Sequence, residues 1–129
     1  MLARLPQPFH YRPRMVVAYA SSVHASLCAR HFRRLGWEVH LASSGSDARR
    51  VAHALTPEVV ILDTQLPDES GWLTCAKMAL ETGARKVVIV SPEITEEETR
   101  LAEAAGAAAL VCRGNGMPRL VEEVIGNAS

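Results

Sequence analysis

The sequence predicts an α/β fold in which a parallel sheet of five strands is covered by helices on both faces. Short apolar runs alternate with segments of helical spacing along the 129 residues, and two of these runs, 15–20 and 108–112, are apolar throughout. A strand that is apolar on both sides belongs to a parallel sheet between two layers of helices. Five strand–helix units in about 115 residues indicate a doubly wound sheet, whose commonest form at this size is the flavodoxin-like order 2-1-3-4-5.

The predicted strands are the five apolar runs at 15–20, 38–42, 58–62, 86–90 and 108–112. The segment before them, residues 1–14, holds three prolines and three arginines and has neither helical nor strand periodicity. We therefore expect a flexible or loosely docked N-terminal arm over 1–14 and one folded domain over 15–126.

Five helices are expected between and after these strands. In the first, Ser21 or Ser22 can cap the start and Gly36 can end the helix. Its apolar stripe is predicted to be Val23, Leu27, Cys28 and Leu35. The second helix ends before Pro57, and its stripe is Ala48, Val51, Ala52 and Leu55.

The third helix is expected over 71–82. The fourth begins at a capping box formed by Thr95 and Glu98, with acidic residues in its first turn, where the helix dipole favours them. Pro118 suits the first turn of the fifth helix, whose inward face is predicted to be Val121, Val124 and Ile125.

Formal charge is balanced overall but unevenly distributed. The chain has 14 basic and 14 acidic residues, but residues 1–50 hold eight arginines against two acids, which leaves +6 there and −6 in the remainder. With no net field, neither nucleic acid nor a membrane surface is an expected partner. No apolar run is long enough to span a bilayer, and no signal peptide is apparent. Cys28, Cys75 and Cys112 are expected to be buried thiols in a cytoplasmic protein.

Asp63 is the leading candidate for a functional residue. It directly follows an apolar strand, and ligands of open parallel sheets bind beyond the carboxyl ends of the strands. Ser91 and Arg113 follow the fourth and fifth strands and are expected at the same edge. Position alone leaves a functional role and a turn-forming role for Asp63 equally open.

Several catalytic chemistries lack their residues. The stretch Y-A-S-S at 19–22, where the first strand ends, has neither the glycines nor the lysine of a nucleotide-binding phosphate loop. The five histidines form no H-x-x-x-H pair, and there is no G-x-S-x-G nucleophile elbow. We expect neither a metal site nor an enzyme.

The stretch D-T-Q-L-P-D-E-S-G at 63–71 resembles the phosphoacceptor motif of receiver domains from two-component response regulators. Further similarity lies at 36–45, at 87–91, where the fourth strand ends in a switch hydroxyl, and in A-A-G-A at 104–107. The resemblance covers about 14–125. It implies that Asp63 accepts a phosphoryl group from a histidine kinase, with Mg²⁺ held by that carboxylate, an acidic pair after the first strand and a backbone carbonyl.

The sequence departs from this family pattern at the positions that perform the chemistry. Tyr19 and Ala20 occupy the acidic-pair positions, so Mg²⁺, the usual cofactor, loses its acidic ligands. Pro92 has no N–H to donate to a phosphoryl group. Arg113 replaces the family's lysine, and Leu110 replaces its aromatic switch residue. We expect Asp63 to form an ion pair with Arg113 instead.

Three functions remain open from the sequence. The first is a pseudo-receiver, a phosphorylation-independent module that binds a histidine kinase, a phosphotransfer protein or an effector, with a homodimer left open. The second is a true phosphoacceptor, and the third a binder of a small anionic ligand or second messenger. Arg30, Arg33 and Arg34 share one exposed patch on the first helix, and are candidates for partner docking because the family's first helix contacts histidine-containing partners.

Overall fold

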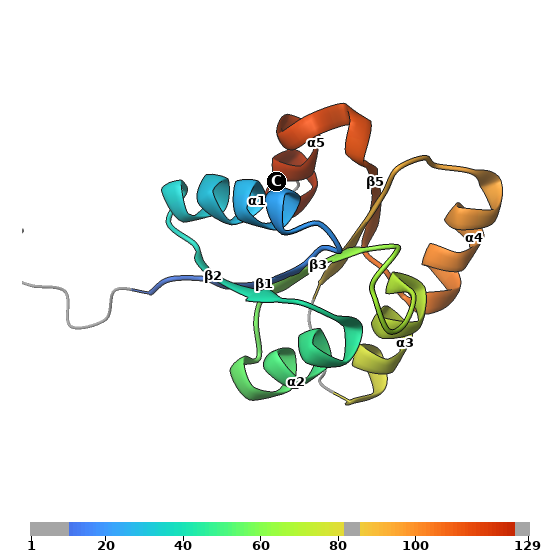
Figure 1. Ribbon diagram of the computed structural model, residues 1–129, viewed down its shortest axis with the longest axis horizontal. Helices are drawn as coiled ribbons and strands as arrows, with labels where there is room; N and C mark the ends of the chain where they lie inside the picture. Colours follow the sequence, from blue (N-terminus) through green and yellow to red (C-terminus); the bar gives the residue numbers. More distant parts are fainter. Residues whose placement is uncertain (1–10, 82–85, 126–129) are drawn as a thin grey trace, which may run out of the picture.

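The computed structural model describes residues 11–81 and 86–125, which form one five-stranded parallel sheet flanked by helices (Figure 1). The strands lie in the order β2-β1-β3-β4-β5, as predicted. Their bounds are β1 Arg14–Ala18, β2 Glu38–Ala42, β3 Val59–Asp63, β4 Val87–Ser91 and β5 Ala109–Cys112. The helices are α1 Ser22–Arg34, α2 Gly45–Leu55, α3 Gly71–Glu81, α4 Glu96–Ala105 and α5 Gly116–Ile125, with a short 3-10 turn η2 at Arg113–Asn115.

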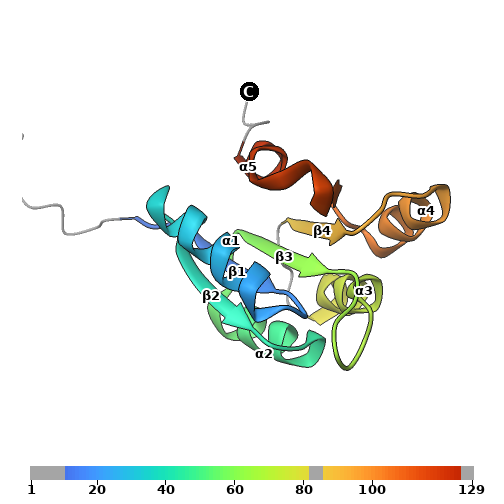
Figure 2. The ribbon, with the colours of Figure 1, turned by 45° about the horizontal axis from the view of Figure 1, so that its top comes forward.

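Helices cover both faces of the sheet, and each face has its own apolar core. Helices α1 and α5 lie on one face, while α2, α3 and α4 follow each other on the opposite side (Figures 1 and 2). Alternate strand residues supply the two cores: Val17 and Ile61 point to the first face, Ala18 and Leu62 to the second. The sequence of β3 is apolar on both sides because both sides are covered.

Three strand predictions need correction at their ends. β1 runs from Arg14 to Ala18 rather than over 15–20. Tyr19 and Ala20 leave the sheet there to start the connection to α1. β3 and β4 extend one residue further than predicted, so that Asp63 and Ser91 are the last residues of their strands. Residues 1–10 of the expected arm, and Thr82 of the third predicted helix, lie outside the described residues.

The predicted helix starts are confirmed by their caps. The Ser21 side chain accepts from the backbone N–H of His24 at the start of α1, and that of Thr95 accepts from Glu98 N–H at the start of α4. After α1 the chain turns at Gly36, whose φ of 97° is a left-handed conformation that favours glycine.

The predicted inward face of α1 is confirmed at Cys28 but wrong at Val23, Leu27 and Leu35. Val23 and Leu27 are 65% and 52% exposed, and the buried side consists of Ala25, Cys28, Ala29 and Phe32. These residues also follow a helical i, i+3, i+4, i+7 pattern, but alanine is a weak hydrophobic signal. Val23 and Leu27 lie on the exposed side of the helix instead.

A similar correction applies to α5, where Leu120 and Val124 are buried while Ile125 is 40% exposed. In α2 the prediction holds for Ala48 and Ala52, with Val51 and Leu55 half-buried. Cys28 and Cys75 are buried free thiols as expected, while Cys112 is only partly buried.

We predict that Phe32→Ala destabilises the domain by about 3–5 kcal/mol, because a fully buried aromatic ring on α1 is replaced by a cavity. Urea unfolding followed by circular dichroism measures the change. Leu80→Ala on α3 is the control, since Leu80 is 89% exposed and its truncation is expected to change the free energy of unfolding by less than about 0.5 kcal/mol. Equal effects of the two variants would contradict the packing described here.

Candidate functional site

Asp63 is a buried carboxylate at the carboxyl end of β3, in the middle of the sheet. Its Oδ2 accepts from the backbone N–H of Ala20 at 3.3 Å, and its Oδ1 accepts from the N–H of Gln65 at 3.3 Å. The same Oδ1 lies 3.1 Å from Nη2 of Arg113. The carboxylate is therefore held by backbone donors from two connections and by one cation.

The predicted ion pair between Asp63 and Arg113 is present. Arg113 begins the η2 turn after β5, and its side chain is one-third exposed while that of Asp63 is buried. A buried carboxylate needs a compensating cation or hydrogen-bond donors. The Arg113 guanidinium supplies both a positive charge and a hydrogen-bond donor, from the position that matches the lysine of receiver domains.

Tyr19 supplies no charge to this pocket. Its side chain is buried in the core between the sheet and α1, where it packs with Ala25 and Cys28. Burial, with the nearby Cys28 and Asp63 adding to it, raises the pKa of Tyr19 well above its usual range. The phenol therefore stays neutral at physiological pH. Ala20 contributes only the N–H that binds Asp63.

The residues do not fit a magnesium site. Mg²⁺ requires a near-octahedral set of oxygen ligands, usually including carboxylates. Residues 18–21 carry no carboxylate, so no shift of the alignment restores the acidic pair. No group of three or more His, Cys, Asp or Glu side chains in residues 11–81 and 86–125 could hold a metal. Arg113 already occupies one face of the Asp63 carboxylate.

Ser91, at the end of β4, is held by an acid that the sequence assigned only to a helix cap. The buried Ser91 hydroxyl lies 2.8 and 3.0 Å from the two carboxylate oxygens of Glu98 and 2.7 Å from the carbonyl oxygen of Glu93. Its single proton can be donated to one of them at a time. One of the two hydrogen bonds of the predicted capping box is present, from the Glu98 N–H to the Thr95 hydroxyl. The Glu98 side chain, which would make the other, bonds Ser91 in β4 instead.

The other residues singled out near this edge are spread around it. Pro92 is exposed, and its carbonyl oxygen accepts from the thiol of Cys112 at 3.5 Å. Leu110 is half-buried in β5 and packs against the second core, on the α3–α4 side of the sheet. Ser91 and Cys112 are register partners, so Ser91, Pro92 and Arg113 do belong to one edge of the sheet.

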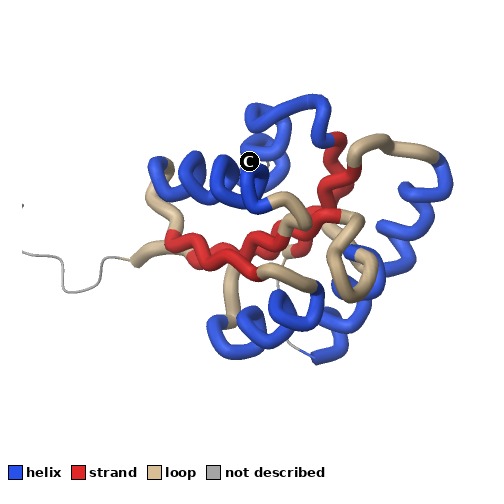
Figure 3. The backbone as a smooth tube through the Cα atoms, in the orientation of Figure 1, coloured by secondary structure: helices blue, strands red, loops and turns tan. Residues whose placement is uncertain are grey.

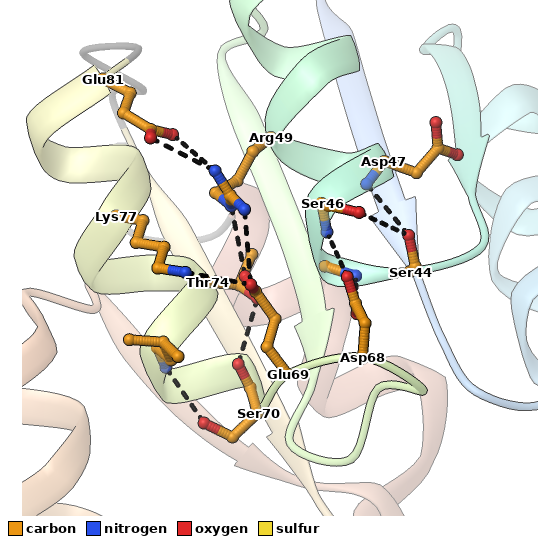
Figure 4. Close-up of polar contacts among 12 residues, drawn as sticks. Ser44, Ser46, Asp47, Arg49, Asp68, Glu69, Ser70, Thr74, Lys77 and Glu81 are labelled. Atoms are coloured by element: carbon orange, nitrogen blue, oxygen red, sulfur yellow. Dashed lines mark hydrogen bonds and ion pairs between the residues drawn. The ribbon is translucent and has the colours of Figure 1, made fainter.

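The loop that follows Asp63 is fastened to the start of α2 by Asp68 (Figure 4). The Asp68 carboxylate accepts from the N–H of Gly45 at 2.7 Å and from that of Ser46 at 2.9 Å. These hydrogen bonds, chiefly those from the Ser46 and Gly45 backbone, lower the pKa of Asp68 from 3.8 to about 2. An acid at a helix N-terminus also complements the helix dipole. The sequence indicated only a turn here.

Glu69 fastens the same loop to α2 and α3. Its carboxylate accepts from the Thr74 hydroxyl at 2.6 Å, from Arg49 Nε at 3.2 Å and from Lys77 Nζ at 3.3 Å. Arg49 continues to Glu81 at the end of α3, 3.1 Å away (Figure 4). This network of two acids and two bases joins elements that are far apart in sequence, so sequence reasoning had no signal for it.

Gly71 ends the loop in a position that excludes any other residue. A Cβ atom there would lie 2.3 Å from the carbonyl oxygen of Asp63. The Gly71 N–H donates to the carbonyl of Thr64 at 2.9 Å, so the start of α3 closes directly onto the end of β3.

Arg30, Arg33 and Arg34 lie in the second half of α1, away from the end of the helix that adjoins Asp63, and all three are exposed. Arg33 donates to the carbonyl of Val39 at 2.8 Å, which fixes its side chain against β2. Their separation from Asp63 follows from the fold, since α1 runs back along the sheet (Figure 3). The three arginines do not take part in the Asp63 pocket.

The fold, the buried acid at the end of β3 and the loop closed by Gly71 match a known family. The family model for the response regulator receiver domain matches residues 17–125. The chain belongs to the receiver domain family. It is therefore a receiver domain of two-component signalling, a family whose members interact with histidine kinases and with effector domains and are generally not enzymes themselves.

Two curated relatives are consistent with this family. The chain is 30% identical over 101 residues to the probable transcriptional regulatory protein TcrX of Mycobacterium tuberculosis, covering 78% of this chain and 42% of that protein. It is 33% identical over 86 residues to response regulator GacA of Pseudomonas aeruginosa, covering 64% of this chain and 39% of that protein. The chain thus spans about two fifths of the length of these relatives.

Solved structures share the receiver fold. The chemotaxis protein CheY4 of Vibrio cholerae superposes with a TM-score of 0.83 at 16% identity, over 92% of this chain and all of that one. A DNA-binding response regulator of the LuxR family from Staphylococcus aureus superposes with a TM-score of 0.79 at 22% identity, over 87% of this chain and 95% of that one. In the described parts of this receiver domain, no helix is long and apolar enough to cross a membrane.

We predict that Arg113→Met destabilises the receiver domain by about 1–3 kcal/mol, because it leaves the Asp63 carboxylate buried without its cation. Adding Asp63→Asn to this variant removes the charge and is expected to recover part of the loss. Urea unfolding of the two single variants and the double variant measures the coupling. Arg119→Met is the control, since Arg119 is an exposed residue of α5 whose ion pairs within residues 11–81 and 86–125 are with neighbours on its own helix. A coupling energy of zero would contradict a stabilising pair.

We predict that Asp68 makes the domain acid-sensitive between about pH 4 and pH 2. Folding lowers the pKa of Asp68 from 3.8 to about 2. The contribution of Asp68 to the free energy of unfolding is therefore complete above the pKa of the unfolded state and is lost as pH falls through the pKa of the folded state. Asp68→Asn is expected to reduce stability at pH 6 and to make stability depend less on pH below pH 4. Unfolding midpoints measured from pH 2 to pH 6 test this, and parallel curves for both proteins would contradict it.

Proposed function

We propose that this receiver domain acts as a phosphorylation-independent interaction module in two-component signalling. The observation that carries the proposal is the closed pocket around Asp63. Its carboxylate is paired with Arg113 and bound by the N–H groups of Ala20 and Gln65, and the neighbouring end of β1 adds no second acid.

Phosphoryl transfer to a carboxylate needs charge neutralisation that this pocket lacks. Charge on the transferring group must be stabilised at fixed positions, normally by a metal ion together with protein donors. Residues 18–21 offer no carboxylate for such an ion. Arg113 is a single cation whose planar guanidinium is already directed at Asp63.

Two further contacts support the proposal. The Ser91 hydroxyl lies against Glu98 and Glu93, so it would have to leave these acceptors in order to donate toward Asp63. The following residue, Pro92, has no N–H to contribute. A phosphoryl group at Asp63 would therefore have few donors on the β4 side.

We propose that the unchanged scaffold is used to bind a protein: a histidine kinase, a phosphotransfer protein or an effector. Arg30 and Arg34 of α1 are exposed cations and have no ion-pair partner among the described residues. They offer a basic docking surface to an acidic partner face. The acidic first turn of α4, Glu96–Glu98, gives a second surface of opposite sign, through which two copies could pair.

A second candidate function is that of a true phosphoacceptor, which the position of Asp63 favours. The acid is the last residue of the central strand, Ser91 ends the neighbouring strand, and a cation stands after β5. A Burkholderia pseudomallei response regulator of the same fold is described with a phosphorylated aspartic acid and a calcium ion, at 20% identity. Phosphorylation of Asp63 in this chain would require an unusual way of holding the metal ion, because the acidic pair is missing.

We predict that acetyl phosphate or beryllofluoride with Mg²⁺ leaves this protein unmodified. Intact mass and the amide NMR shifts around Asp63 are the readouts. Tyr19→Asp with Ala20→Asp restores two carboxylates and is expected to produce Mg²⁺-dependent modification, which a further Asp63→Asn must abolish. Since Tyr19 is buried, Ala20→Asp with Arg113→Lys provides a second test that keeps the core intact. Mg²⁺-dependent modification of the unaltered chain would establish the phosphoacceptor instead.

A further inference from the structure

A cavity of about 210 Å³ lies between α1 and α5, beside the Asp63–Arg113 pair and separate from the docking surfaces proposed above. Its walls are mainly apolar and come from the connection after β1 and from α1, β4, β5 and α5. They are formed by Tyr19, Leu27, Cys28, Val111, Met117 and Leu120. Protein interiors rarely leave hollows larger than a water molecule, so a space of this size marks a place that a ligand can fill.

The size of the cavity selects small ligands. A dry apolar cavity of about 150 Å³ suffices to bind benzene, so this one accommodates one aromatic ring or a short aliphatic chain with a small substituent. Its position is the one where open parallel sheets bind ligands, at the carboxyl ends of the strands. Leu27 at its rim is 52% exposed, which gives access from solvent.

The polar groups of the wall point to one kind of substituent. Of the other polar groups at the wall, the Cys112 thiol donates to the carbonyl oxygen of Pro92, and the His24 ring lies beside that of Tyr19, with ring centroids 6.1 Å apart. Arg113 differs: within the part of the chain that the structure describes, its guanidinium donates only to Asp63, and its Nε is buried without an acceptor. A guanidinium carries five N–H donors, so the Nη groups of Arg113 keep donors beyond the one given to Asp63, while the buried Nε presents no surface to the cavity.

The charge at the wall is already balanced. Asp63 neutralises Arg113, so a carboxylate placed in the cavity would lie close to a buried negative charge without gaining a free cation. What Arg113 lacks is a further hydrogen-bond acceptor, not an anion. An uncharged carbonyl oxygen supplies an acceptor at the lowest desolvation cost.

We propose that this cavity is a binding site for a small, largely apolar molecule bearing one uncharged carbonyl group, with the carbonyl oxygen accepting from Arg113. Binding does not require phosphorylation of Asp63, and it couples the ligand to the ion pair through Arg113.

Three probes of similar size test the inference by NMR titration of the whole chain. Acetophenone has the carbonyl, ethylbenzene lacks it, and benzoate replaces it with a charge. We expect acetophenone to shift the amides of Cys28, Cys112 and Leu120 while leaving Gly45 on the opposite face unchanged. Ethylbenzene is expected to bind about tenfold more weakly, because it leaves the donors of Arg113 without an acceptor. Benzoate is expected to be weaker than acetophenone.

Variants separate the cavity from general surface binding. Leu27→Trp places a large ring at the rim and is expected to abolish the acetophenone shifts. Leu73→Trp is the matched control, because Leu73 is a 46% exposed leucine of α3 that does not line the cavity. In an Asp63→Asn background, Arg113→Met is expected to reduce acetophenone to the affinity of ethylbenzene without leaving a buried charge unpaired.

Each other outcome overturns the inference. Absence of saturable shifts with all three probes would show that the cavity is not a site. Equal affinities for acetophenone and ethylbenzene would remove the role of Arg113, and tighter binding of benzoate would replace the carbonyl ligand with an anionic one. Binding that survives Leu27→Trp would place the site elsewhere.

Discussion

The Asp63–Arg113 pair is the interaction on which the carboxyl edge of this sheet depends. A carboxylate at the end of the central strand is buried by the connections around it, and burial without a cation or donors would be strongly destabilising. Arg113, which follows the edge strand β5, and two backbone N–H groups from neighbouring loops meet this need. The same contacts occupy the oxygens that a metal ion or a phosphoryl group would require, so stability of the edge and the chemistry of a working receiver compete for one carboxylate.

A second set of contacts fixes the loop that follows Asp63. Asp68 caps the start of α2, Glu69 binds Arg49 and Lys77, and Gly71 allows α3 to begin against the Asp63 carbonyl. These charged groups are partly exposed, and isolated surface ion pairs contribute little, but a network with backbone hydrogen bonds holds the loop in one position. Together with the ion pair, the network argues for a domain whose pocket has one preferred arrangement, which suits a binding module.

Sequence patterns predicted the strand order and the existence of all five helices, because periodicity and caps are local properties. They were wrong about which side of α1 faces the sheet. Val23 and Leu27 are larger than Ala25 and Ala29, yet the alanines are buried together with Phe32, because burial follows the side of the helix that packs on the sheet and not the size of the side chain. Glu98 shows the same limit: its spacing from Thr95 predicts a capping box, whereas its carboxylate bonds Ser91 in another element.

The sequence by itself determined the family, the position of the acid at Asp63 and the lack of a second acid at residues 18–21, because motifs and missing residue types can be read directly from the chain. It also predicted the Asp63–Arg113 pair, since parallel strands bring their carboxyl ends together. Only the tertiary structure decided that Ser91 is held by Glu98, that Asp68 and Glu69 fasten the loop, and that a cavity lies between α1 and α5 beside Arg113. These features join residues far apart in sequence, and their distances depend on packing rather than on any local pattern.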